Sequence, residues 1–208
     1  MSTPLRRTPH RTKSEAKRQN ILVTASALFL KHGFDGVSMN QVAIDAGVSK
    51  QTVYSHYGSK EELFNAIIEF KCAIHEFTDR VFDTSRPVHE VLQELAEHFS
   101  ALLMSDEAIC IFRVCIGGAA QRTQIAELFW KAGPQRLAQR FREYLTEQNR
   151  LGKIHLDNPH FAAQQFLYMI KAEAYLQKAL GQANGHNQQE LPSYLASCVA
   201  MFEKAYVN

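Results

Sequence analysis

The sequence predicts an all-α protein, because apolar residues recur three and four positions apart along most of its 208 residues. The alternation that predicts β-strands is nearly absent. Serines at positions 38, 49 and 59 are placed to cap three helices within 22 residues, and each such cap is worth about 1 kcal/mol. A hydrophobic content of 46% in a chain of this length predicts a globular core that needs no disulfide or metal.

The charge is unevenly distributed along the chain. The net charge of +2 comes from 23 basic and 21 acidic residues, but residues 1–60 hold nine of the basic and only three of the acidic ones. The remaining 148 residues carry 14 basic and 18 acidic side chains. A basic first quarter on an acidic remainder indicates an anion-binding module, although a solvated basic tail would give the same count.

Composition also bounds the compartment and the chemistry. Residues 1–20 lack a secretory signal, and the apolar stretch 108–120 is too short to span a bilayer, so we expect a cytoplasmic protein. Cysteines 72, 110, 115 and 198 lack metal-binding spacing. We expect buried thiols and no cofactor, with a redox pair of Cys110 and Cys115 as the alternative.

The N-terminal elements follow from periodicity and capping signals. Residues 1–13 predict a flexible basic arm. A helix over about 14–32 follows, with Thr12 and Glu15 as its capping box and Gly33 after its end. Two short helices end at Gly47 and at about Tyr57, and a long helix runs from Ser59 to about Phe82. The apolar stripe of the long helix is formed by Leu63, Ile67, Phe70, Ile74, Phe77 and Val81.

The C-terminal elements are amphipathic helices. We expect them over about 88–103 and 106–117, then over 123–149 with a break at Gly133-Pro134. Pro159 opens a helix that ends near Gly181. The polar stretch 182–190 predicts a loop, and the last helix covers about 193–206.

Residues 38–57 have the pattern of a helix-turn-helix. This motif needs a small residue where the two helices cross, a glycine in the turn and an apolar residue behind the second helix. Ala43, Gly47 and Val53 supply these at offsets of four and six. The alternative is a pair of short core helices joined by a glycine turn.

The second helix of this motif has two distinct faces at 100° per residue. Val53 and Tyr57 share the core side, whereas Gln51, Thr52 and Ser55 point the opposite way, toward a major groove. Tyr54 and His56 lie on the flanks, where they contact phosphates or else pack against neighbouring helices. The two phosphate candidates at helix starts are Lys50 and Lys60.

The order of these residues resembles a known family. The run Gly33-Phe34, Val42-Ala43, Ala46-Gly47-Val48-Ser49, Thr52-Val53-Tyr54, His56-Tyr57 and Ser59-Lys60-Glu61-Glu62-Leu63-Phe64 is similar to the N-terminal domain of TetR-family transcriptional regulators. The similarity covers about residues 15–65. Phe112-Arg113-Val114, Leu128-Phe129-Trp130, Gly133-Pro134 and Ala162-Ala163-Gln164-Gln165-Phe166 are similar to the C-terminal domain of AefR-like members.

The resemblance implies a homodimeric repressor that binds a palindromic DNA operator and is released by a small-molecule effector. The domains would be the arm at 1–13, a helix-turn-helix domain at 14–60 and an effector-binding and dimerisation domain at 61–208. The dimer face would use about 160–180 and 193–206. Family DNA contacts carry over to Ser38, Asn40, Lys50, Gln51, Thr52, Tyr54, His56 and Lys60.

The candidate effector site is a cavity inside the C-terminal domain. Its aromatic candidates, each of which is alternatively a core residue, are Phe99, Phe112, Trp130, Phe166 and Tyr175. Arg113 is a charge within an apolar helix, and it pairs with an acid, reaches solvent or meets an anionic ligand.

Two competing functions remain. A helical enzyme or small-molecule carrier would use the same C-terminal pocket, but the sequence lacks a nucleophile elbow, a P-loop, an HExxH motif and a His/Cys metal cluster. A membrane-surface protein would use the basic arm, which lacks the apolar face that membrane binding needs. We therefore predict that the protein is not an enzyme and has no membrane partner.

Overall fold

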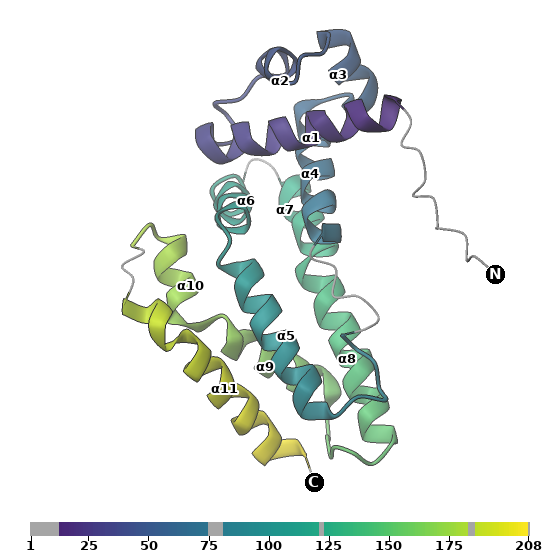
Figure 1. The fold of residues 1–208 in the computed structure, drawn as a ribbon, viewed down its shortest axis with the longest axis vertical. Helices are drawn as coiled ribbons and strands as arrows, with labels where there is room; N and C mark the ends of the chain where they lie inside the picture. The colour runs from purple at the N-terminus through teal and green to yellow at the C-terminus, as the bar shows by residue number, and fades with distance from the viewer. Residues whose placement is uncertain (1–12, 75–80, 121–122, 183–185, 208) are drawn as a thin grey trace, which may run out of the picture. The chain divides into compact units, whose positions relative to one another are not determined.

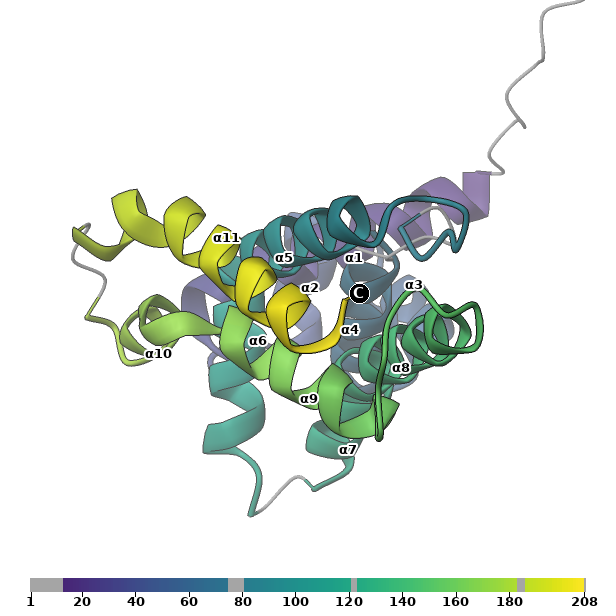
Figure 2. The same ribbon diagram turned by 90° about the horizontal axis from the view of Figure 1, so that it is seen from below.

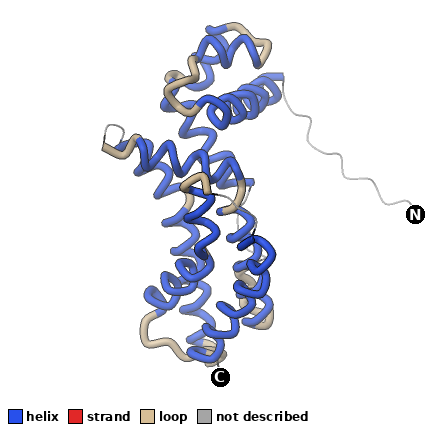
Figure 3. The backbone as a smooth tube through the Cα atoms, turned by 90° about the vertical axis from the view of Figure 1, so that its left-hand side faces the viewer, coloured by secondary structure: helices blue, strands red, loops and turns tan. Residues whose placement is uncertain are grey.

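The computed structural model describes residues 13–74, 81–120, 123–182 and 186–207. The predicted arm, its Thr12 cap and Phe77 lie outside these residues. The described chain consists of helices joined by loops, which confirms the all-α prediction (Figure 3). It divides into two compact units, Met1–Ile67 and Ile68–Asn208, and each is described separately below.

The N-terminal unit, called the head below, is built from α1, α2, α3 and the start of α4 (Figure 1). The bounds of these helices are Lys13–His32, Met39–Asp45, Lys50–Tyr57 and Lys60–Ile74. Three phenylalanines form the centre of the head, because the rings of Phe29, Phe34 and Phe64 lie 5.3–5.6 Å apart. Ile21 of α1 and Val53 of α3 are fully buried, and each lies on the helix face that the periodicity predicted to be apolar.

The C-terminal unit, called the body below, holds the remaining helices. They are α5 (Val88–Leu103), α6 (Asp106–Gly117), α7 (Thr123–Ala132), α8 (Pro134–Arg150), α9 (Pro159–Ile170), α10 (Ala172–Ala179) and α11 (His186–Tyr206). The predicted break between α7 and α8 is confirmed, because Gly133 separates them and Pro134 opens α8.

The core of the body lies between α5, α8, α9 and α11. The last of these helices lies beside both α5 and α9 (Figure 1 and Figure 2). Phe141, Phe166 and Phe202 are fully buried at its centre, with ring centroids 5.0–6.5 Å apart. Aromatic residues in this geometry contribute both buried area and ring–ring attraction.

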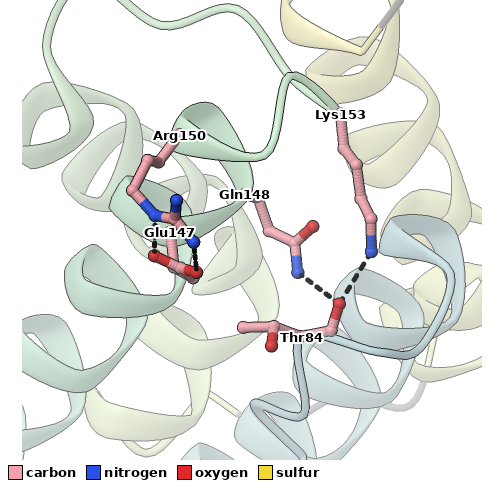
Figure 4. Close-up of polar contacts among 5 residues, drawn as sticks. All are labelled: Thr84, Glu147, Gln148, Arg150 and Lys153. Atoms are coloured by element: carbon pink, nitrogen blue, oxygen red, sulfur yellow. Dashed lines mark hydrogen bonds and ion pairs between the residues drawn. The ribbon is translucent and has the colours of Figure 1, made fainter.

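The prediction that the fourth helix continues to Phe82 is wrong, because Val81 and Phe82 lie in a turn. Their burial comes from packing on α8, where the Phe82 ring lies 5.9 Å from the Tyr144 ring. The turn is fixed to α8 and to the segment after it at the Thr84 carbonyl oxygen, which accepts hydrogen bonds from Gln148 Nε2 of α8 (3.2 Å) and from Lys153 Nζ (2.7 Å) (Figure 4). Helical spacing cannot distinguish such a buried turn from a helix.

The predicted single helix from Pro159 to Gly181 is two helices. They meet at Lys171 and Ala172, and Ala172 has a φ of +53°, in the left-handed region. A non-glycine residue rarely adopts this conformation, and the sequence here carries no Gly or Pro that signals a break. The interruption directs α10 toward α6 and α11.

The last helix begins earlier than predicted. It starts at His186 rather than at about 193, and Pro192 lies inside it. The polar residues 186–190 show no apolar periodicity, so the sequence predicted a loop there. A proline within the first turns of a helix removes one backbone hydrogen bond, and packing of the apolar remainder of the helix offsets that loss.

Candidate nucleic-acid interface and effector pocket

Serine caps set the starts of both helices of the helix-turn-helix. The Ser38 hydroxyl accepts a hydrogen bond from the Gln41 backbone N–H, and the Ser49 hydroxyl accepts one from the Thr52 N–H, each at 3.1 Å. Both serines have extended backbones, as N-cap residues do. The predicted caps are therefore present. They set the residue at which each helix begins.

The turn between these helices requires Gly47. Its φ of +63° is in the left-handed region, and a Cβ built there would meet no atom within 4 Å. The glycine is thus required by its backbone conformation and not by crowding. The backbone N–H of Val48 donates to the Ala43 carbonyl at 3.0 Å, which closes the turn in the manner of a helix C-cap.

Two long-range hydrogen bonds hold the motif against α1. The Tyr57 hydroxyl, at the end of α3, donates to the Arg18 carbonyl at 2.8 Å. The Asn20 side chain donates to the Ala46 carbonyl, also at 2.8 Å. Tyr57 is buried, and burial raises the pKa of its hydroxyl, so it stays a donor at neutral pH. These contacts fix the orientation of the helix-turn-helix relative to α1.

With Val53 and Tyr57 buried, the opposite side of α3 faces outward as predicted. Gln51 and Ser55 are exposed, and Tyr54 exposes 43% of its surface. The Lys50 ammonium lies 5.7 Å from the centre of the Tyr54 ring. This face combines amide, hydroxyl and cationic groups, which are the groups that read base edges and phosphates.

The other candidate DNA contacts are less uniformly placed. Ser38 and Asn40 are exposed at the start of α2. The Thr52 hydroxyl lies 2.7 Å from the Ser49 hydroxyl, so it belongs to the cap of α3, and His56 is half-buried. The side chain of Asn40 is therefore more accessible to a base or a phosphate than those of Thr52 and His56.

The Lys60 side chain is bonded within the head. Its ammonium donates to the carbonyl oxygens of Phe34 (2.9 Å) and Val37 (3.1 Å), and it lies 4.4 Å from the centre of the Phe34 ring. Two of its three N–H donors are thereby used to hold the loop between α1 and α2. No pattern in the sequence predicts this role, because both acceptors are backbone atoms.

The body contains a cavity of about 180 Å³. It is bordered by Ile68 of α4, by α5, α6, α7 and α8, and by the junction of α9 with α10. Its walls are mostly apolar, and the Phe112 and Tyr175 rings lie 5.5 Å apart on one side. Burial raises the pKa of Tyr175 to about 12, so its hydroxyl remains neutral. An apolar cavity with a few polar groups is the usual form of a small-molecule site.

The cavity separates the predicted ligand residues into two groups. Phe99, Phe112 and Tyr175 line it. Phe166 is fully buried in the core of the body, and Trp130 is 52% exposed on α7; neither is among the lining residues. Helical periodicity identifies an apolar face, but it does not show which part of that face is filled by neighbouring side chains.

Arg113 has a partner that the sequence did not suggest. Its guanidinium donates to the carbonyl oxygens of Lys178 (2.8 Å) and Ala179 (2.9 Å), at the C-terminal end of α10. The last carbonyls of a helix lack the donor four residues further along the helix and carry partial negative charge, so they take the place of the expected acid. Lys178 adds an ion pair with Asp106 at 2.8 Å, which joins α10 to the start of α6.

Sequence reasoning missed the charged residues of the cavity. Glu107, Arg136, Arg140 and Lys171 line it together with the apolar residues. Lys171 follows Met169 and Ile170 directly. A charge beside an apolar run was the signal that singled out Arg113, and the same criterion would have found Lys171.

Two further features concern the described residues as a whole. In them, no helix has the length and apolar character needed to cross a membrane. Within the same ranges, no group of three or more His, Cys, Asp or Glu side chains could hold a metal ion.

Two family models match the chain. The model described as bacterial regulatory proteins of the tetR family matches residues 21–67. The model described as the C-terminal domain of AefR-like transcriptional repressors matches residues 90–208, more than half of the chain. The first match covers most of the helix-turn-helix head, and the second covers the helices that border the cavity except α4 and the start of α5.

The proteins that are similar to this chain include transcriptional regulators. The HTH-type transcriptional repressor SCO4008 of Streptomyces coelicolor is 39% identical over 57 residues, which are 27% of this chain and 30% of that protein. A Mesorhizobium loti structure titled as a TetR-family transcriptional regulator has a TM-score of 0.83 at 26% identity, covering 95% of this chain and 100% of that one. The flavonoid-responsive regulator FrrA has a TM-score of 0.75 at 27% identity, covering 92% and 97%.

Proposed function

Because the chain belongs to the TetR family of transcriptional regulators, we propose that it is a cytoplasmic repressor that binds an operator through α3 and leaves it when an effector occupies the body. The observation that carries this proposal is the outward face of α3 in the head. Its polar side chains are exposed, while the opposite side of the helix is buried and hydrogen-bonded to α1.

The proposed DNA contacts divide by chemistry. Gln51 would contact base edges from the first turn of α3, and Tyr54 would contact the sugar-phosphate backbone from its second turn. Asn40 would contact the backbone from α2. Lys50, at the N-terminus of α3, would bind phosphate, where helix N–H groups also favour an anion. The net excess of six basic residues in the first 60 positions supports an anionic partner for the head.

The effector is proposed to bind in the cavity of the body. Phe99, Phe112 and Tyr175 give it an aromatic lining, which suits a compact organic molecule. FrrA, a similar chain, is named as flavonoid-responsive, and this supports a small-molecule effector. An effector that weakens operator binding a hundredfold needs about 2.7 kcal/mol of coupling between the two sites.

The dimer face is proposed to lie on α9 and α11. Phe161 and Tyr168 are seven residues apart on α9 and are 58% and 63% exposed. Tyr194 and Met201 have the same spacing on α11 and are 41% and 54% exposed. The Tyr194 hydroxyl donates to the Met169 carbonyl at 2.8 Å, so the two rows are adjacent. Exposed apolar rows of this kind mark a protein interface, and a second copy would place two heads on a palindromic operator.

The test is binding of the chain to DNA that flanks its own gene, measured by fluorescence anisotropy at several salt concentrations. We expect Gln51→Ala and Tyr54→Ala to weaken sequence-specific binding by about 1–3 kcal/mol each. We expect Lys50→Gln to weaken binding and to make the slope of log affinity against log salt shallower by about one.

The matched control is Lys31→Gln, which changes the charge equally. Lys31 is exposed and lies 13 residues beyond Arg18 on α1, about 20 Å along the helix from the point that contacts α3. It should leave the salt slope unchanged. If Gln51→Ala and Tyr54→Ala both bind the DNA like the unmodified protein, the assigned surface is wrong.

A further inference from the structure

The charges that line the cavity of the body are mostly positive. Arg136, Arg140 and Lys171 border it together with a single acid, Glu107. The whole chain beyond residue 60, these four residues included, has the opposite balance, with 18 acidic and 14 basic residues. The excess of cations is therefore a local property of the cavity and not a consequence of overall composition.

Lys171 is the cation with the least compensation from its surroundings. It is half-buried at the junction of α9 and α10, and burial lowers the pKa of its ammonium group. The ammonium lies 4.3 Å from the centre of the Tyr168 ring. Within the described residues, no carboxylate pairs with it. A partly desolvated ammonium without a counter-ion gains more from an incoming anion than a solvated one does.

The backbone holds Lys171 at this position. It is the last residue before Ala172, whose φ of +53° separates α9 from α10. The far end of α10 is fastened to α6 by the Lys178–Asp106 ion pair and by Arg113. Lys171 therefore lies at a fixed interruption between two packed helices, on the border of the cavity.

We propose that the cavity selects an organic anion with an aromatic or aliphatic body, and that Lys171 binds the anionic group. This inference rests on the proposed effector site and specifies its ligand class. A neutral ligand would displace water from the ammonium without replacing its hydrogen bonds, whereas a carboxylate, sulfonate or phenolate would replace them with a charge-assisted bond.

The experiment uses two fluorescent probes that share an aromatic framework. 8-Anilinonaphthalene-1-sulfonate carries an anionic group, and N-phenyl-1-naphthylamine lacks it. We expect the full chain to bind the sulfonate at least tenfold more tightly. We expect Lys171→Gln to weaken the sulfonate about tenfold, equal to about 1.4 kcal/mol, and to change the neutral probe by less than about twofold. These margins are set by the strength of charge-assisted hydrogen bonds relative to neutral ones.

Two variants control for folding and for net charge. Lys171→Arg keeps the charge and should retain most of the sulfonate affinity. Lys131→Gln removes a lysine of α7 whose side chain is 66% exposed and does not line the cavity, and it should change neither affinity. Thermal unfolding followed by circular dichroism shows whether each variant is folded.

A cavity-filling variant separates this inference from the proposed function. Ala108 is a half-buried lining residue of α6, and Ala108→Phe should abolish binding of both probes. If both probes still bind, the cavity is not their site, and the proposed effector site fails with the inference. If Ala108→Phe blocks both probes but Lys171→Gln affects them equally or not at all, the anion selectivity is wrong and the effector site stands. Failure of the sulfonate to bind the unmodified chain also overturns the inference.

Discussion

At the scale of single residues, a lysine has a different role at the start of α3 than at the start of α4. Lys50 is exposed at the start of α3, whereas Lys60 at the start of α4 donates to the Phe34 and Val37 carbonyls. The sequence predicts both as phosphate contacts, because each is a lysine at a helix N-terminus. The difference depends on backbone acceptors more than 20 residues away, which no local pattern encodes.

The contrast between these lysines can be tested by stability. Lys60→Met keeps the aliphatic length over Phe34 but removes the ammonium donor from two partly buried carbonyls, of which the Phe34 carbonyl keeps only a 3.5 Å bond from the Val37 N–H. We therefore expect a loss of about 1–3 kcal/mol in the free energy of unfolding. Lys50→Met should stay within about 0.5 kcal/mol of the unmodified chain. Urea denaturation followed by circular dichroism measures both. Equal stability of the two variants would mean that Lys60 does not support the loop between α1 and α2.

The two cysteines of α6 are a second case at this scale. Burial raises the pKa of Cys115 to about 11 and also raises the pKa of Cys110, so both thiols are protonated at pH 7. Residues five apart on an α-helix have Cα atoms about 8.7 Å apart, beyond the roughly 7 Å that a disulfide can join. The geometry of α6 therefore argues against the alternative of a redox pair.

We expect N-ethylmaleimide to modify Cys115 at pH 7 at least about a hundredfold more slowly in the native chain than in urea, because the thiolate is scarce and the side chain is buried. Mass spectrometry of the peptide that contains Cys115 gives the two rates. Modification at similar rates in both conditions would show that this thiol is accessible in the folded body.

At the scale of elements, the sequence predicted the helices whose ends carry a chemical signal. Ser38, Ser49 and Gly133-Pro134 each mark a boundary that the structure confirms. The errors occur where no such signal exists, as at Val81–Phe82 and at Lys171–Ala172. There the boundary is set by tertiary packing, since α8 buries the first segment and α6 holds α10 beyond the second.

The interruption between α9 and α10 gives a prediction about substitution. A left-handed conformation costs a non-glycine residue about 1–2 kcal/mol, whereas glycine adds about 0.4–1 kcal/mol of conformational entropy to the unfolded chain. We therefore expect Ala172→Gly to leave the free energy of unfolding unchanged or to raise it by up to about 1.6 kcal/mol.

Ala174→Gly, two residues further along α10, is the matched control. The residue is buried within the helix, so the substitution should lower the free energy of unfolding by about 1 kcal/mol. Urea denaturation of both variants compares them under identical conditions. A destabilisation of similar size in both would contradict the left-handed conformation of Ala172.

At the scale of the whole molecule, the net charge of +2 is the sum of a basic part and an acidic part, which have different proposed partners. The basic excess lies in the first 60 residues, which include the helix-turn-helix, and the acidic excess lies in the remainder. The exposed polar face of α3 could be predicted from the sequence, because a helix-turn-helix is a local motif with fixed spacing. The cavity could be predicted only in part, because residues from α4 to α10 that are distant in the sequence line it together.

Operator binding by this protein should be coupled to assembly of the dimer. One head presents one α3, which is too small a surface for a specific site, so operator affinity should depend on the dimer. We expect Met201→Glu to place an unpaired charge in the apolar face of α9 and α11, which costs about 3 kcal/mol or more and raises the dimer dissociation constant at least about a hundredfold.

Ile116→Glu on α6 is the control, because Ile116 is 63% exposed and lies outside that face. Sedimentation velocity and operator anisotropy on the same samples should show Met201→Glu as a monomer with weak operator binding and Ile116→Glu as a dimer with unchanged affinity. A dimeric Met201→Glu variant with full operator affinity would place the interface elsewhere on the body.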